Sequence, residues 1–355
     1  MKLIVACGGT GGHSFPGLAV ASELASRGND VTVWISGRDV ETSVLKGWSG
    51  PVFATGARPL SLKNAMRNIR AFMRCLGEMK RVRPDALLAM GSYSSLPPVI
   101  AAARRRVPVV LHEANTVPGR AIDFLSNFAR AVAISFENTA QYFPGKNTVL
   151  TGLPVRLDVA GQPPFENVPE GAFRVFVTGG SQGAHRVNEI ASKALVLLSR
   201  NLASRGRRLY VIHQTGVNDE AEVARAYASA GIPARVKAFE HEMGRAFATA
   251  DVVIARAGAS TCFELALTGK PAFLIPLPSA LRNHQHFNAA VFVAAQAAAE
   301  GRQDELSPRS LANWLLHKAE NKYSIAEMAR RMSALRRPDA ASKVADLVER
   351  VAREG

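Results

Sequence analysis

Leu3-Ile-Val-Ala-Cys-Gly-Gly-Thr-Gly-Gly-His13 joins an apolar run directly to a glycine-rich turn, and a helical pattern follows it. The same arrangement returns at Thr178-Gly-Gly-Ser-Gln-Gly-Ala-His185. A glycine-rich turn between a strand and a helix exposes backbone N–H groups at the positive end of the helix dipole, where phosphate binds well. Two such turns in step with strands predict two similar halves. They also predict a ligand cleft between the carboxyl edges of their sheets, although a single turn of this kind could simply be a tight connection.

Short apolar runs alternate with helical patterns along the chain. Continuous Val, Ile, Leu and Ala runs are typical of strands that are buried on both faces, and their alternation with helices predicts parallel α/β sheets. The strands are predicted at residues 3–7, 31–35, 86–90, 107–111, 131–135, 173–178, 209–215, 234–238, 252–255 and 272–276.

A length of 355 residues predicts two domains, and the proline-rich stretch 152–171 breaks the rhythm between them. We therefore expect an N-terminal Rossmann-like domain over 1–152, a linker over 153–171 and a C-terminal Rossmann-like domain over 172–330. A final helix over 331–355 is expected to pack back toward the N-terminal domain.

The charge is strongly basic and concentrated in one region. The chain has 44 Lys+Arg against 29 Asp+Glu, a net charge of +15, and eleven of the basic residues lie in 58–106. Within 62–81, apolar residues recur at helical spacing beside Lys63, Arg67, Arg70 and Arg74. This amphipathic pattern suits an anionic membrane surface, or else a solvated basic face over an ordinary core stripe. A nucleic-acid partner is disfavoured because the charge is localised and aromatic residues make up only 7%.

Several classes of protein are excluded by missing motifs. Ser14 stands where the dinucleotide fingerprint needs glycine, and the sequence has no P-loop motif and no Asp-x-Asp metal clamp. The three cysteines are isolated, so neither a disulfide framework nor a zinc site is expected. No apolar run is long enough to span a bilayer, and the start lacks a signal peptide, so a cytoplasmic location without cofactor or metal is expected.

Polar residues cluster after several predicted strands. Glu264 lies about one turn into a helix after 252–255, where its carboxylate could bind both ribose hydroxyls or close a capping box with Thr261. The polar run 283–288 suits sugar hydroxyls. His13 could act as a general base or only hydrogen-bond at a helix start.

Five motifs together resemble the MurG family of peptidoglycan N-acetylglucosaminyltransferases. They are Gly8-Gly-Thr-Gly-Gly-His-Ser-Phe-Pro16, His112-Glu-Ala-Asn115, Thr151-Gly-Leu-Pro-Val-Arg156, Gly179-Gly-Ser-Gln-Gly183 and Arg256-Ala-Gly-Ala-Ser-Thr-Cys-Phe-Glu264. The resemblance covers residues 1 to about 320. It implies an α/β protein of the GT-B fold, in which two Rossmann-like domains have parallel sheets that face a deep cleft, and a reaction that needs no metal.

The resemblance also implies site residues. For the donor UDP-GlcNAc, it implies the diphosphate near Ser181, Gln182 and Gly183, the ribose at Glu264 and uracil near the backbone of Phe239 and Glu240. His284 and Gln285 would meet the sugar hydroxyls. The other implied substrate-binding residues are Thr10, Gly11, Gly12, Asn115, Arg156, Ala259, Ser260 and Thr261. His13 is the preferred base, and Glu113 is the alternative.

The implied reaction is an inverting transfer of GlcNAc to the 4-hydroxyl of MurNAc in lipid I, the undecaprenyl-linked acceptor, which gives lipid II. Its implied setting is the inner face of the cell membrane, with 62–81 on the anionic surface and other cell-wall synthesis proteins as further partners. Ala114, Ser92 and Leu153 depart from the family pattern on the acceptor side and at the hinge. The competing predictions are a UDP-sugar 2-epimerase and another lipid-directed GT-B transferase.

Overall fold

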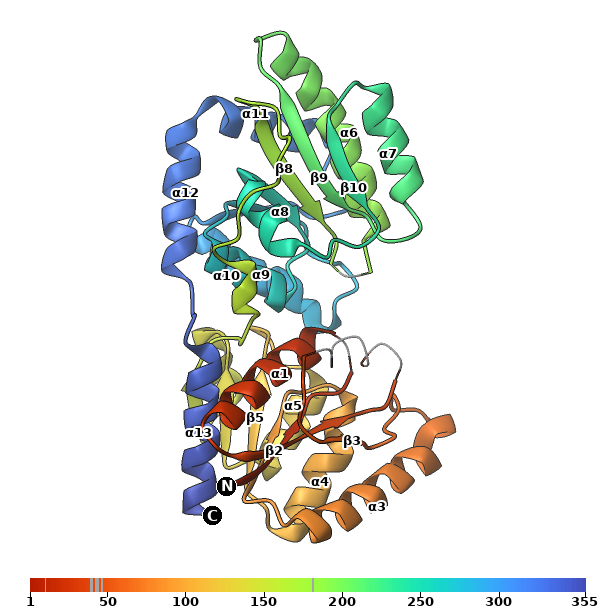
Figure 1. Cartoon of the computed structure of the whole chain (residues 1–355), viewed down its shortest axis with the longest axis vertical. Coiled ribbons are helices and arrows are strands. Elements are labelled where there is room, and N and C mark those ends of the chain that lie inside the picture. Colours follow the sequence, from red (N-terminus) through yellow and green to blue (C-terminus); the bar gives the residue numbers. More distant parts are fainter. Residues whose placement is uncertain (10, 39–40, 42–44, 46, 181) are drawn as a thin grey trace. The chain divides into compact units, whose positions relative to one another are not determined.

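The computed structural model of the chain describes residues 1–9, 11–38, 41, 45, 47–180 and 182–355. The chain divides into two compact units, labelled by element in Figure 1. The first unit contains Met1–Arg156 together with Arg337–Gly355, and the second contains Leu157–Arg336.

The first unit is built on a seven-stranded sheet with strand order β3-β2-β1-β4-β5-β6-β7, in which every neighbouring pair is parallel. Residues of the interior strand Lys2–Ala6 alternate between two cores: Leu3 and Val5 join one, and Ile4 and Ala6 join the other. This burial on both faces explains the continuous apolar runs. The strands are β1 (Lys2–Ala6), β2 (Asp30–Ile35), β3 (Val52–Ala54), β4 (Ala86–Ala89), β5 (Val109–Glu113), β6 (Ala131–Ile134) and β7 (Thr148–Leu150).

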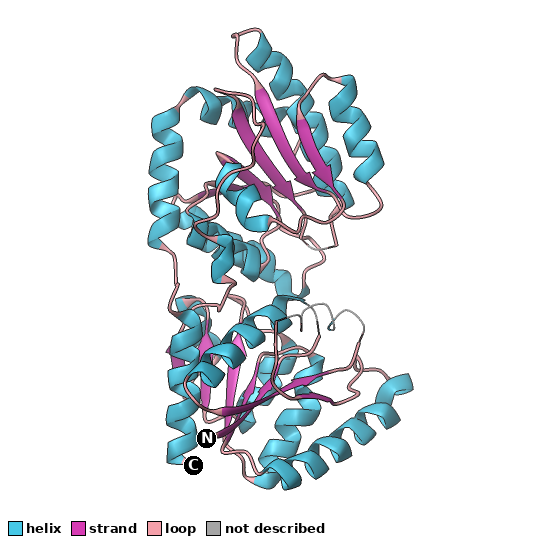
Figure 2. Cartoon of the chain, in the orientation of Figure 1, coloured by secondary structure: helices cyan, strands magenta, loops and turns pink. Residues whose placement is uncertain are grey.

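Helices cover both faces of this sheet (Figure 2). They are α1 (Gly11–Ser26), α3 (Ala65–Val82), α4 (Leu96–Arg105), α5 (Arg120–Leu125) and α13 (Ala340–Glu354). The C-terminal α13 lies beside α1, where Val344 and Val348 are fully buried in the core that Leu3 and Val5 share (Figure 1). At the surface of this contact, Arg27 at the end of α1 pairs with Asp346 at 2.6 Å.

The second unit has a six-stranded sheet with strand order β10-β9-β8-β11-β12-β13, again parallel throughout. Val175 and Val177 of β8 enter a core with the helices α6 (His185–Ala203) and α11 (Pro308–Glu320), while Phe176 on the opposite face meets Phe247 edge-to-face at 5.4 Å between ring centroids. The strands are β8 (Phe173–Thr178), β9 (Leu209–Gln214), β10 (Ala234–Lys237), β11 (Val252–Ala255), β12 (Ala272–Leu274) and β13 (Ala298–Glu300).

The helices of the second unit follow its strands in sequence. They are α6 (His185–Ala203), α7 (Glu220–Ser229), α8 (Met243–Thr249), α9 (Ala259–Thr268), α10 (His284–Ala294), α11 (Pro308–Glu320) and α12 (Lys322–Ala334). Helix α12 keeps Met328 and Met332 buried in this unit, so residues 331–336 belong here and not with the final helix as expected. The short 3-10 helix η5 (Leu157–Val159), which falls in the expected linker, also belongs to this unit.

The predicted α/β class with parallel sheets is confirmed. The strands β3, β7 and β13 were not predicted, because each has three residues and lies at a sheet edge, where burial does not impose a long apolar run. The expected cleft depends on how the two units are placed relative to one another and stays a prediction.

Candidate active site

The first glycine turn connects β1 to α1 and needs glycine for steric reasons. Gly9 has φ +127°, and a Cβ on it would lie 2.7 Å from Ser92 Oγ. A Cβ on Gly8 would lie 2.5 Å from the backbone nitrogen of Ser36. The loops after β2 and β4 therefore pack directly on this turn. Thr10, one of the predicted site residues, lies outside the described residues.

Glu41 is a buried partner of this turn that sequence reasoning missed. Its carboxylate accepts hydrogen bonds from the Gly9 N–H and the Ser36 hydroxyl, both at 2.6 Å, and from the Gly37 N–H at 2.7 Å. The expectation that the turn leaves its N–H groups for a phosphate is therefore wrong for Gly9, since a carboxylate of the chain itself already occupies that donor. Gly11 and Gly12 begin α1 beyond it.

His13, the third residue of α1, is fixed in its tautomer by a hydrogen bond. Its Nδ1 lies 2.8 Å from the carbonyl oxygen of Met90, at the end of β4. A carbonyl can only accept, so Nδ1 carries the proton and Nε2 of the neutral ring is the nitrogen able to take one. Gly91, with φ +93°, passes beside the ring, and a Cβ there would lie 3.4 Å from Cε1.

Glu113, the alternative base, ends β5 and holds the turn that follows it. One carboxylate oxygen accepts from the Asn115 N–H at 2.8 Å and from its side-chain amide at 3.2 Å, and the other accepts from the Gly119 N–H at 3.0 Å. Burial raises the pKa of Glu113 to about 7. Both oxygens are thus engaged by the chain, and the side chain is only 3% exposed.

The remaining first-unit candidates lie at the same carboxyl edge of the sheet. Burial lowers the pKa of His112 to about 4, and its neutral ring donates from Nε2 to the Gly152 carbonyl at 3.1 Å. The guanidinium of Arg156 lies over the ring of Phe15 in α1, 5.1 Å from its centroid. This edge of the sheet therefore brings together the ends of β4 and β5, the start of α1 and Arg156, the last residue before the second unit.

The second glycine turn connects β8 to α6 and is held as tightly as the first. Gly183 has φ +73°, and a Cβ on it would lie 2.0 Å from the carbonyl oxygen of Thr215. The side chain of Gln214 donates to the Gly180 carbonyl at 3.0 Å. The turn is thus clamped against the end of β9. Ser181, predicted to face the diphosphate, lies outside the described residues.

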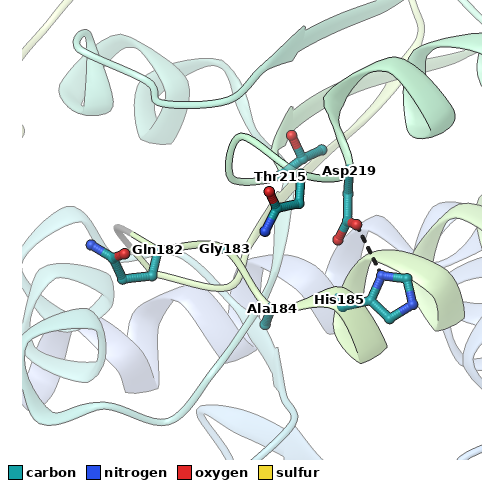
Figure 3. Close-up of a pocket in the computed structure, with 7 residues that line it drawn as sticks. Gln182, Gly183, Ala184, His185, Thr215 and Asp219 are labelled. Atoms are coloured by element: carbon teal, nitrogen blue, oxygen red, sulfur yellow. Dashed lines mark hydrogen bonds and ion pairs between the residues drawn. The ribbon is translucent and has the colours of Figure 1, made fainter.

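A cavity of about 210 Å³ opens beside this turn (Figure 3). Across it, His185 Nδ1 and Asp219 Oδ1 point toward one another at 2.9 Å. The hydrogen bond to Asp219 raises the pKa of His185. The cavity is lined by Gln182, Gly183, Ala184, His185, Thr215, Asn218 and Asp219.

Beneath the cavity lies a buried polar network that no local sequence pattern predicts. Asn188 donates to Asp219 Oδ2 and to the Thr215 carbonyl, both at 2.7 Å, and its Oδ1 lies 3.1 Å from His213 Nε2. Tyr227 donates to His213 Nδ1 at 2.8 Å, and burial lowers the pKa of His213 to about 3, so this ring is neutral. The network ties the start of α6 to the end of β9.

Helix α9 contradicts the capping-box alternative for Glu264. The N-cap is Gly258, which has no side chain to cap the helix, and Ala259 is the first helical residue. Thr261 is therefore inside the helix, where it cannot serve as an N-cap for Glu264. No side chain at the N-cap accepts hydrogen bonds from the first-turn N–H groups of Ala259, Ser260 and Thr261. A helix start of this kind favours the binding of an anion.

Two further predicted residues are at the start of α10. Gln285 accepts from the Leu277 N–H at 3.0 Å, which fastens the loop after β12, and His284 is half-buried with Nδ1 2.9 Å from the Leu281 carbonyl. Nearby, buried Arg256 donates to the carbonyls of Ile275 and Pro276 at 3.1 and 3.0 Å. These contacts join the ends of β11 and β12.

Glu240 differs from the other donor-site candidates because its side chain faces inward. It is 3% exposed and pairs through both oxygens with Arg235, at 2.8 and 3.2 Å. The neighbouring Phe239 is 46% exposed. Only the backbone near Glu240, and not its carboxylate, is therefore placed to meet a ligand.

The basic segment 62–81 splits into two faces. The 3-10 helix η1 (Leu62–Asn64) leads into α3, whose Ala71, Cys75 and Met79 are buried. The alternative of an ordinary core stripe is wrong for four of its members, because Leu62, Met66, Ile69 and Met73 are 98%, 63%, 54% and 60% exposed. These four follow helical spacing, and the neighbouring Lys63, Arg67, Arg70 and Arg74 are also exposed.

Among the described residues, no group of three or more His, Cys, Asp or Glu side chains is arranged to hold a metal ion. No helix in this part of the chain combines the length and apolar character needed to cross a bilayer.

Comparison with known proteins gives consistent matches over both units. The glycosyltransferase family 28 N-terminal domain matches residues 3–134, and the glycosyltransferase family 28 C-terminal domain matches residues 174–351. Two relatives share the name UDP-N-acetylglucosamine--N-acetylmuramyl-(pentapeptide) pyrophosphoryl-undecaprenol N-acetylglucosamine transferase. The protein from Bordetella petrii is 38% identical over 99% of this chain and 98% of its own. The protein from Pelobacter propionicus is 36% identical over 98% of each.

Solved structures agree. The crystal structure of MurG from Acinetobacter baumannii has a TM-score of 0.79 and 29% identity, covering 98% of this chain and 99% of that one. A UDP-GlcNAc 2-epimerase from Neisseria meningitidis, bound to UDP-GlcNAc, has a TM-score of 0.71 over 99% of this chain and 100% of its own. At 12% identity, that likeness concerns the fold alone. The GT-B architecture is thereby confirmed, and the chain belongs to glycosyltransferase family 28 and, within it, to the MurG N-acetylglucosamine transferases.

Proposed function

We propose that the chain transfers GlcNAc from UDP-GlcNAc to the 4-hydroxyl of the MurNAc unit of undecaprenyl-pyrophosphoryl-MurNAc-pentapeptide. The observation that carries this proposal is the match to transferases of that name, with 36% identity over 98% of both chains. The paired glycine turns support it, because each lies at the carboxyl edge of a parallel sheet, where α/β proteins bind their ligands.

In this proposal the second unit binds the donor. The N-termini of α6, after the glycine turn, and of α9, whose N-cap has no side chain, are the proposed binding positions for the diphosphate. Glu264, which is half-buried in α9, binds the ribose hydroxyls, and the start of α10 binds the GlcNAc hydroxyls. As the bond between the sugar and UDP breaks, these fixed N–H dipoles stabilise the negative charge that grows on the departing diphosphate.

We assign the proton transfer to His13. The 4-hydroxyl oxygen attacks the anomeric carbon, UDP leaves with the bonding electron pair, and the hydroxyl proton passes to Nε2 of His13. The Nδ1 contact to Met90 favours this tautomer. Glu113 is the weaker candidate because its two oxygens already accept three hydrogen bonds from Asn115 and Gly119. Its role in the proposal is to hold the turn that carries Asn115.

The acceptor is a membrane lipid, and we propose that α3 docks the enzyme on the anionic inner face of the cell membrane. The exposed row Leu62, Met66, Ile69 and Met73 supplies apolar side chains for the headgroup boundary. The adjacent basic row supplies the attraction to anionic lipids. The protein would thus work on the cytoplasmic side as a peripheral membrane enzyme, alongside other cell-wall synthesis proteins.

One experiment separates this function from the epimerase alternative. The purified protein is incubated with UDP-GlcNAc, with and without a short-chain lipid I analogue, and the nucleotide sugar is followed by NMR. The proposal predicts that UDP-GlcNAc is stable alone and consumed when acceptor is added. Conversion into a second UDP-sugar without acceptor would instead identify an epimerase.

A further inference from the structure

Phe165 lies in the segment that leads from the first unit into β8, and it is anchored in the second unit. Its side chain is buried, and its N–H donates to the hydroxyl of Thr249, at the end of α8, at 2.7 Å. Two guanidinium groups lie over its ring, with Arg235 at 4.3 Å and Arg245 at 4.9 Å from the centroid. A cation this close to an aromatic face is held by the ring quadrupole.

Arg235 connects Phe165 to the loop that follows β10. Its Nε and one terminal nitrogen donate to the two carboxylate oxygens of Glu240, and the same terminal nitrogen lies 3.1 Å from Glu242. Glu240 also accepts from the Glu242 N–H at 3.0 Å. Such a paired fork is geometrically specific, so the position of the guanidinium sets the position of the loop.

The loop 238–242 borders a cavity of about 450 Å³ at the carboxyl end of β10. The half-exposed ring of Phe239 lies beside this cavity and is packed edge-to-face on His241 at 4.9 Å. A planar ring at the carboxyl edge of a parallel sheet is suited to a nucleobase. The cavity is lined by Glu220, Arg235, Lys237, Ala238, Phe239, Glu240, His241 and Glu242.

We propose that Phe165, Arg235 and Glu240 are positioning residues that hold the loop 238–242 in the shape that binds the uracil of the donor. This inference rests on the proposed function, because it takes the donor to be a uridine nucleotide. The ring of Phe165 holds one side of the Arg235 guanidinium, and the carboxylate of Glu240 accepts its two hydrogen bonds on the other side. The position of the guanidinium then determines the position of the loop backbone. None of the three side chains needs to touch the substrate.

The test is Phe165→Leu, which keeps an apolar side chain but removes the aromatic face. Steady-state kinetics and calorimetric titration with UDP are measured on the full chain. Loss of a partly buried cation–π contact predicts that KM for UDP-GlcNAc and Kd for UDP rise about five- to tenfold. The kcat and the KM for the acceptor stay within about twofold, because the reacting groups of the first unit are untouched. Phe165→Tyr, which restores the aromatic face, is expected to return both constants toward the wild-type values.

A matched pair of arginine variants separates loop positioning from a general loss of stability. Arg174 forms the same kind of fork with Asp251, but at the amino ends of β8 and β11. We expect Arg235→Met to raise KM for UDP-GlcNAc more than Arg174→Met does, at equal loss of thermal stability. An unchanged KM in Phe165→Leu, or equal KM changes in the two arginine variants, would overturn the inference. Failure of the wild-type chain to bind UDP would overturn the proposed function instead.

Discussion

At the scale of single residues, the difference between His13 and Glu113 lies in what their polar atoms already bind. The His13 ring uses Nδ1 for the Met90 carbonyl, which directs the basic Nε2 elsewhere. Glu113 uses both oxygens for the turn that begins at Asn115. A general base must receive a proton from the substrate, which suits His13. Glu113 must keep its hydrogen bonds to hold the turn, which suits a structural role.

His13→Asn removes the proton acceptor from this position. Because a positioned general base contributes about 10²- to 10⁴-fold, we expect kcat to fall by that range, with the donor KM within a few-fold. Glu113→Gln is the comparison: it disturbs the turn and should lower kcat much less than His13→Asn does. A His13→Asn enzyme with the wild-type kcat would show that His13 is not the base.

His112 makes a prediction about stability and pH. Burial lowers its pKa to about 4, against about 6.5 in the unfolded chain, so the unfolded state binds more protons between these values. The free energy of unfolding therefore falls as the pH drops through this window. From pH 7 to pH 5 we expect His112 to account for a loss of about 2 kcal/mol.

Denaturant unfolding of wild type and His112→Gln at the two pH values measures this difference. Gln keeps a donor for the Gly152 carbonyl but does not titrate. The variant should lose about 2 kcal/mol less between pH 7 and pH 5 than the wild type does. Equal losses in the two proteins would contradict the assignment of a buried, neutral His112.

At the scale of elements, α3 is the part of the described chain whose exposure most clearly departs from an ordinary surface helix. Leu62, Met66, Ile69 and Met73 form an exposed apolar row, although Ala71, Cys75 and Met79 already pack α3 onto its sheet. Contiguous exposed apolar surface of this kind marks an interaction site. The basic residues beside it favour an anionic bilayer over another apolar protein face.

Charge reversal on α3 tests this surface. Each Lys or Arg near an anionic bilayer contributes about 1 kcal/mol, so losing two charges in Arg67→Glu/Arg70→Glu should weaken vesicle binding about 30-fold or more. Co-sedimentation with vesicles of phosphatidylglycerol and phosphatidylcholine measures the affinity. The matched control is Arg104→Glu/Arg105→Glu, an equal charge change at exposed positions of α4. If both double variants lost similar vesicle affinity, the effect would come from net charge alone, and α3 would not be the docking surface.

At the scale of the whole molecule, the strand–turn–helix units were predictable because their signals are local. The apolar run, the glycines and the helical pattern at Leu3–His13 and Phe173–His185 lie next to one another in the sequence. The bounds of β8 and β11 agree with the sequence prediction to the residue. The domain assignment of residues 331–336 needed tertiary information, because Met328 and Met332 fix α12 by packing and not by pattern.

The site was predictable where polar residues directly follow a strand, and not where partners come from distant segments. His13, Glu113 and Glu264 could be singled out from local motifs. Glu41 could not, because its partner Gly9 is in another loop. The polar chain that runs from exposed His185 through Asp219 and Asn188 to buried His213 likewise joins helices and a strand that only the folded chain brings together.

The proposed reaction joins GlcNAc to a lipid-linked MurNAc acceptor in a single displacement. Mass spectrometry identifies the product made from UDP-GlcNAc and a lipid I analogue, and NMR identifies its new linkage. A single displacement predicts one UDP released per disaccharide lipid, with a β linkage from GlcNAc C1 to the MurNAc 4-oxygen. A product with an α linkage, or loss of UDP-GlcNAc without any disaccharide lipid, would contradict it.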